Sequence, residues 1–126
     1  MSAKLLVVDD DTQFLTGLCL RLKANGFEVI AAKDGVQAIA AARRERPDLI
    51  LLDLGLPGGD GYLVLERLKA LPALTTTPVL VLSAKNWQVH EEKAIKAGAD
   101  GFFEKPVNNE ALVGAIRGLL KMEATG

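Results

Sequence analysis

Cysteine and histidine are nearly missing from this chain of 126 residues, which contains one of each, Cys19 and His90. A single cysteine excludes a disulfide within the chain and any zinc site built from several thiolates. A single histidine excludes a metal site that needs several imidazole ligands. The metal centres that these two residue types usually build are therefore excluded.

Long apolar runs and an excess of charge of one sign are also missing. No apolar run approaches the roughly 18 residues of a membrane-spanning helix, and the short run before Asp9 is too brief for a secretory signal. The chain has 16 acidic and 15 basic side chains, a formal net charge of −1, which leaves no electrostatic footprint for sequence-independent DNA binding. We therefore expect a cytoplasmic protein that neither enters a membrane nor binds nucleic acid directly.

The composition is that of an ordinary globular domain. Hydrophobic residues make up 49% of the chain and charged residues 25%, close to the average for soluble proteins. A chain of this length forms one domain and buries about two-thirds of the surface that it exposes when unfolded. A disordered chain, a collagen-like chain and a coiled coil are excluded.

Apolar runs alternate with amphipathic stretches along the whole chain. Four of the five runs lack polar alternation, as strands do when both faces of their sheet are covered, and the fifth is the weakest. The predicted strands cover residues 5–8, 27–31, 49–52, 79–82 and 101–103. The predicted helices cover about residues 14–22, 36–43, 62–69, 89–97 and 112–120. This alternation predicts an α/β fold with a parallel sheet and helices on both sides.

Charged and hydroxyl side chains follow the predicted strands, at the sheet edge where open α/β folds place their functional sites. Asp9 and Asp10 follow the first strand, Asp53 the third, Ser83 the fourth, and Lys105 comes shortly after the fifth. If the first and third strands are neighbours, three carboxylates converge and raise one another's pKa values. Such a cluster favours a bound cation, and Mg²⁺ prefers oxygen ligands of this kind.

A cation, an ammonium group and a hydroxyl group around one carboxylate indicate phosphoryl transfer. A carboxylate can attack phosphorus and form an acyl phosphate. Asp53 is the best candidate nucleophile because it stands alone at its strand end, which leaves Asp9 and Asp10 free to hold the metal.

These residues and the segments around them resemble the receiver domain of two-component response regulators. The resemblance covers about residues 3–121, which we take as the domain, with residues 122–126 as a C-terminal tail. The supporting segments, in the order and at the intervals usual for that family, are LLVVDD at 5–10, DLILLDL at 48–54, PGGDG at 57–61, AGADG at 97–101 and KP at 105–106.

The resemblance implies a flavodoxin-like, doubly wound sheet of five parallel strands in the order 2-1-3-4-5 with five helices. It implies that Asp53 accepts a phosphoryl group from a sensor histidine kinase or phosphotransfer protein, with Mg²⁺ as cofactor. Asp10 would bind the metal directly, Asp9 through water, and Asp53 and the carbonyl of Gly55 would complete the protein ligands. Lys105 would pair with a phosphoryl oxygen, and the bond before Pro106 is expected to be cis.

The resemblance also implies a switch. Ser83 would bind a phosphoryl oxygen and Phe102 would fill the space that it leaves, so that the surface of the fourth helix, fifth strand and fifth helix changes for an output domain or partner. Such a domain is not an enzyme in the usual sense, although it promotes its own phosphorylation and dephosphorylation. Homodimerisation through the same surface is compatible with the resemblance.

Four positions depart from the usual pattern without removing the phosphoryl-transfer set, and one of them, Ser83 in place of the commoner threonine, keeps the hydroxyl group. Gly55 carries no side chain two residues after the acceptor, which we expect to leave the site open to water and to affect hydrolysis of the acyl phosphate. Lys85, two residues after Ser83, can reach the mouth of the site. Phe102 lacks the hydroxyl group of the commoner tyrosine.

Other interpretations remain beside this one. Asp11 or Thr12 is expected to cap the first helix, His90 to be a solvated surface residue, and Trp87 to lie either in the core or at a partner contact. The chain could be a pseudo-receiver, an interaction module independent of phosphate. A phosphohydrolase of the haloacid dehalogenase class is less favoured, because Gln13 stands where its motif needs threonine or valine.

Overall fold

The computed structural model describes residues 2–55, 61–83 and 87–125, of which residues 87–90 and 122–125 are described by their backbone alone. Five parallel strands form one sheet in the order β2-β1-β3-β4-β5. The strands are β1 (Lys4–Val8), β2 (Glu28–Ala32), β3 (Leu49–Asp53), β4 (Val79–Ser83) and β5 (Gly101–Glu104). The helices in the described residues are α1 (Thr12–Ala24), α2 (Gly35–Glu45), α3 (Gly61–Ala70), α4 (Trp87–Lys96) and α5 (Asn109–Thr125), with a 3₁₀ turn at Pro72–Leu74. The predicted fold class, strand order and five helices are confirmed.

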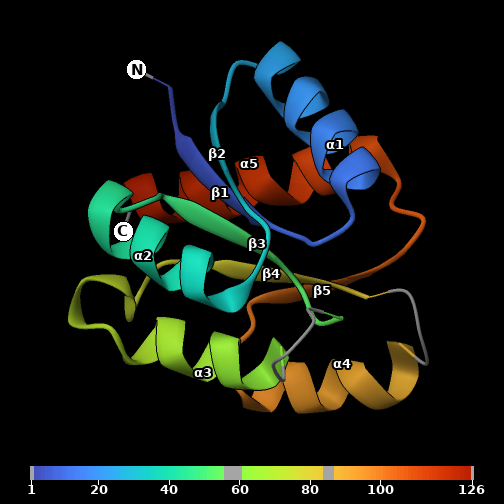
Figure 1. Cartoon of the computed structure of the whole chain (residues 1–126). Coiled ribbons are helices and arrows are strands. Elements are labelled where there is room, and N and C mark those ends of the chain that lie inside the picture. The colour runs from blue at the N-terminus through green and yellow to red at the C-terminus, as the bar shows by residue number, and fades with distance from the viewer. Residues whose placement is uncertain (1, 56–60, 84–86, 126) are drawn as a thin grey trace.

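Helices cover both faces of the sheet (Figure 1). On one face α1 and α5 bury leucines such as Leu18 and Leu112 against the strands. On the other face α2, α3 and α4 bury side chains such as Ala42, Leu65 and Ala94. Because β3 lies at the centre of the order and is covered on both faces, all its residues are buried. This explains the strand sequences without polar alternation.

Short-range signals set the helix ends. The Asp11 carboxylate accepts hydrogen bonds from the backbone N–H groups of Gln13 and Phe14, so it caps α1. Gly26 and Gly98 adopt positive φ values of 91° and 112° after α1 and α4, as glycines after a helix commonly do. The cap expected at Asp11 or Thr12 is therefore confirmed, at Asp11.

The last helix is longer than the sequence interpretation expected. α5 continues to Thr125, beyond residue 121, where a C-terminal tail was expected to begin. The added residues are mostly good helix formers, and no glycine or proline occurs among residues 119–125 to stop the helix. Within the described part of the chain, no helix combines the length and apolar character needed to cross a bilayer.

Candidate functional site: an acidic cluster at the carboxyl ends of the strands

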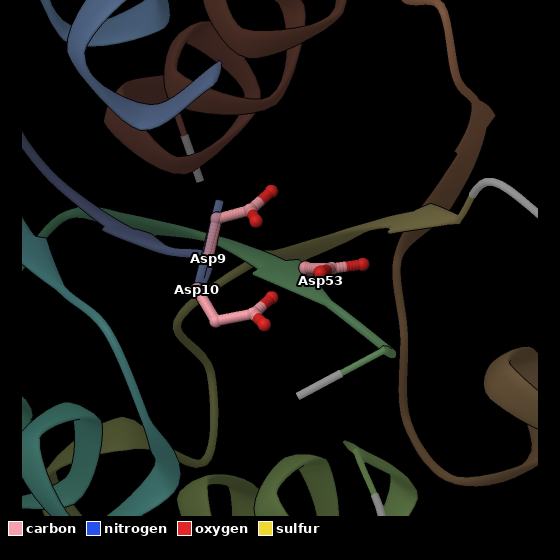
Figure 2. Close-up of side chains that lie close together, drawn as sticks. All are labelled: Asp9, Asp10 and Asp53. Carbon is pink, nitrogen blue, oxygen red and sulfur yellow. The ribbon is translucent and has the colours of Figure 1, made fainter. Parts of the chain in front are cut away.

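Three carboxylates converge where β1 and β3 end. The register pairs Val8 with Leu52, so Asp9 and Asp10 leave β1 beside Asp53, the last residue of β3. An oxygen of each carboxylate lies within 4.8 Å of one from each of the others. Figure 2 shows all three side chains pointing to the same side of the sheet edge. Their convergence, expected if β1 and β3 were neighbours, is confirmed.

The three acids differ in burial. Asp9 is 1% exposed and Asp53 is 6% exposed, whereas Asp10 is exposed to solvent. Asp9 Oδ1 accepts a hydrogen bond from the Asp11 N–H at 2.9 Å. Asp9 is therefore a buried residue of the site, and the residue that caps α1 is Asp11.

Lys105 supplies the positive charge of the cluster. Its Nζ donates to Asp9 Oδ2 at 2.7 Å and lies 3.7 Å from Asp53 Oδ2. The Lys105–Pro106 peptide bond is cis, as expected. The backbone N–H of Lys105 donates to the Ser83 carbonyl at 2.8 Å, which ties the end of β5 to the end of β4. The lysine thus reaches the carboxylates from the far side of β4.

Phe14 is a member of the site that sequence reasoning missed. Its ring centroid lies 4.2 Å from Lys105 Nζ, a distance at which a cation and an aromatic face attract each other. The sequence predicts only that residue 14 begins the first helix. No short-range signal could have revealed the contact, because it joins α1 to the loop after β5.

The environment of Asp53 opposes its charge. Burial raises the pKa of Asp53, and the neighbouring Asp9 and Asp10 carboxylates raise it further. The Gly55 N–H, which donates to Asp53 Oδ1 at 3.1 Å, and the Lys105 ammonium group act in the opposite direction. A cation beside Asp53 would stabilise the charged form of its carboxylate.

Ser83, Phe102 and Gly55 are the remaining predicted site residues that the structure describes. Ser83 is buried at the end of β4, directly after Leu82, the register partner of Asp53. Phe102 is half-buried and packs on the α2, α3 and α4 face. A Cβ atom built on Gly55 would lie 3.6 Å from both Asp53 oxygens, so glycine leaves this side of the Asp53 carboxylate uncovered. Lys85, residues 57–60 and the side chains of Trp87 and His90 lie outside the described residues.

The chain is similar to known response regulators along most of its length. The model of the response regulator receiver domain matches residues 5–117. The chain is 37% identical to the response regulator PleD of Caulobacter vibrioides over 98% of its own length and 27% of that relative. It is 39% identical to the transcriptional regulatory protein PrrA of Mycobacterium tuberculosis over 95% of its own length and 51% of that relative.

Solved structures show the same fold. A putative response regulator from Chloroflexus aurantiacus superposes with a TM-score of 0.91 at 32% identity, over 96% of this chain and 99% of that one. A CheY-like receiver domain protein from Methanospirillum hungatei gives a TM-score of 0.92 at 28% identity, with both chains fully covered. The chain therefore belongs to the response regulator receiver family, whose members act in two-component signalling. It spans about half or less of the curated relatives described above.

Proposed function

We propose that this chain is a phosphorylation-dependent signalling switch in which Asp53 is the phosphoryl acceptor. The observation that carries the proposal is the cluster itself, in which Asp9, Asp10 and Lys105 all lie beside the Asp53 carboxylate. The donor is the phosphohistidine of a sensor histidine kinase or a phosphotransfer protein. An Asp53 oxygen attacks phosphorus, an O–P bond forms, and the P–N bond breaks with its electron pair staying on the histidine nitrogen.

The cluster fits a divalent cation of the Mg²⁺ type. Three carboxylates that share one site are a hard-oxygen ligand set, and Asp10 is both exposed and within reach of the other two. Asp9 already accepts the short hydrogen bond from Lys105, which suits a more indirect role for it, while Asp53 and the Gly55 carbonyl would contribute further oxygens. The bound ion would neutralise charge that develops on the transferred oxygens.

The residues around Asp53 then hold and detect the phosphoryl group. Its oxygens are acceptors for the Lys105 ammonium group and the Ser83 hydroxyl group, and charge-assisted hydrogen bonds of this kind are short and strong. Movement of Ser83 towards the group shifts the end of β4, and Phe102 follows into the vacated space. We propose that the surface of α4, β5 and α5 changes in consequence and controls an output domain or a partner protein, or a second copy of the chain.

The proposal is tested by treating the protein with acetyl phosphate and Mg²⁺ and measuring its intact mass. The wild-type chain should gain one phosphoryl group, and Asp53→Asn should gain none. Asp48→Asn is the matched control, because Asp48 is an exposed acid directly before the start of β3, far from the strand end that holds Asp53, and it should be modified as the wild type is. A wild-type chain that stays unmodified would support the pseudo-receiver alternative instead.

A further inference from the structure

A hollow between α1 and the outer edge of the sheet plays no part in the chemistry at Asp53. Its volume is about 320 Å³, within the lower range of ligand sites. α1 and β2 form its walls, and Figure 1 shows the two elements side by side at one edge of the molecule. The lining residues are Thr12, Leu15, Thr16, Cys19, Leu20, Lys23, Val29, Ala31 and Lys33.

The edge of β2 beside this hollow is available for pairing. β2 is the first strand in the sheet order, and among the described residues no strand pairs with its outer side. The Glu28 N–H donates to the Ala3 carbonyl, and the Asp9 N–H donates to the Ala32 carbonyl. Backbone groups of a strand alternate in direction, so the N–H and C=O groups of Val29 and Ala31 point away from β1, towards the open edge.

The surface of the hollow is apolar in its middle and positive at its ends. The Leu20 side chain is 64% exposed, and it lies with Cys19 on the wall opposite Val29. Lys33 directly follows the last residue of β2, and Lys23 lies in the last turn of α1, which runs back towards the start of β2. Both lysines are exposed. Among the residues that the structure describes, no acidic side chain lines the hollow.

We propose that this hollow docks an extended acidic segment of a partner protein, which adds a strand beside β2. The segment's backbone would pair with Val29 and Ala31, its apolar side chains would cover Leu20, and its carboxylates would meet Lys23 and Lys33. Strand addition of this kind draws affinity from the main chain and specificity from alternate side chains. A second copy of this chain fits less well, because Lys23 and Lys33 of both copies would then lie at one interface. Lysines at a sheet edge oppose such self-pairing.

The probe is a capped octapeptide in which serine alternates with the series glutamate, valine, valine, glutamate, titrated into the ¹⁵N-labelled full chain. In an extended strand the valines and glutamates then share one face, with the glutamates towards its ends. Amide shifts should concentrate at Val29, Ala31 and Leu20. The double variant Lys23→Glu/Lys33→Glu should weaken binding about tenfold, since each reversed surface charge changes the affinity modestly and two are reversed. The control Arg43→Glu/Arg67→Glu changes net charge equally at exposed positions on α2 and α3 and should bind the peptide as the wild type does.

Two further peptides sharpen the test. A version that is N-methylated at alternate residues removes the backbone donors and should lose binding, which separates strand addition from simple adsorption. A version with lysine in place of both glutamates should not bind. Shifts elsewhere, equal binding of the basic peptide, or no effect of the lysine reversals would overturn the proposal. So would a concentration-dependent dimer that Leu20→Ser abolishes, because the occupant would then be a second copy. Asp53→Asn should bind the peptide normally, so the outcome is independent of phosphorylation.

Discussion

The ammonium group of Lys105 is held by Asp9 rather than by Asp53. It lies 2.7 Å from Asp9 Oδ2 and 3.7 Å from Asp53 Oδ2. Asp9 is the most deeply buried of the three acids, so the strongest ion pair of the site forms where solvent competes least. Lys105 thus lies beside Asp53 without forming its shortest ion pair there, which is compatible with the proposed role of Asp53 as phosphoryl acceptor.

Replacement of Asp53 by asparagine should stabilise the fold at neutral pH. Burial and the neighbouring acids raise the pKa of Asp53 in the folded protein above its ordinary value of 3.8. Between the ordinary pKa, which applies to the unfolded chain, and the raised pKa of the folded protein, the folded protein binds more protons than the unfolded chain. The free energy of unfolding therefore falls as pH rises through that window. Asp53→Asn removes this loss. We expect its free energy of unfolding at pH 7 to exceed that of the wild type by roughly 1 kcal/mol, which is the scale of one like-charge contact that Lys105 partly offsets.

The measurement is urea unfolding in the presence of a chelator at several pH values between 3 and 8. The difference between Asp53→Asn and wild type should be small at the acid end and grow with pH. A constant difference across the series would contradict the electrostatic origin.

Removal of the Lys105 charge should tighten Mg²⁺ binding. The ammonium group and a cation compete for the same carboxylates, so Lys105→Met leaves the cluster more negative. An increase of about tenfold in Mg²⁺ affinity, equivalent to 1.4 kcal/mol, is expected in a calorimetric titration. Lys96→Met is the control, because Lys96 is 76% exposed and pairs with Glu92 on α4; it should leave the affinity unchanged. Weaker binding by Lys105→Met would mean that the lysine supports the metal site instead of competing with it.

The contact between Phe14 and Lys105 should appear as a coupling energy. Phe14→Leu keeps an apolar side chain but removes the aromatic face beneath the ammonium group. A double-mutant cycle of Phe14→Leu with Lys105→Met, followed by chemical denaturation, should give a coupling of about 0.5–1 kcal/mol. Additive effects would show that the two side chains are merely adjacent.

A side chain at position 55 should prolong the life of the acyl phosphate. The Cβ position of Gly55 faces both Asp53 oxygens at 3.6 Å, so an asparagine there would cover the acceptor and hinder water. After phosphorylation and removal of the donor, Gly55→Asn should lose its phosphoryl group severalfold more slowly than the wild type, as followed by intact mass. Gly55→Ala should lie between the two, and faster loss in either variant would contradict the shielding argument.

Two glycine-to-alanine changes should have opposite effects on stability. A Cβ on Gly61 would lie 2.5 Å from the carbonyl oxygen of Leu54, whereas nothing lies within 4 Å of one on Gly17. Gly61→Ala should therefore destabilise the protein by about 1–3 kcal/mol through overpacking. Gly17→Ala, within α1, should stabilise it by about 0.5–1 kcal/mol through helix propensity. Thermal denaturation of both variants checks the pair.

Much of the fold was predictable because its signals are local. The apolar runs of β1 to β4 mark buried strands, and even the weakest prediction, at residues 101–103, is confirmed as β5. The helix stop at Gly98 likewise follows from residues next to each other in the chain. The predicted end of the fifth helix, near residue 120, is wrong. α5 continues to Thr125 because the following residues have good helix propensity and include no stop signal.

The amino-acid sequence by itself determined which residues end the strands, and hence that Asp9, Asp10 and Asp53 would share one edge if their strands were neighbours. Strand periodicity and caps act over a few residues, so they can be read without a structure. Only the tertiary structure decided that Asp9 is buried and Asp10 exposed, that Lys105 pairs first with Asp9, that Phe14 lies against Lys105, and that β2 keeps an open edge beside α1. These features join segments far apart in the chain, and their energies depend on distance and burial, which no local pattern encodes.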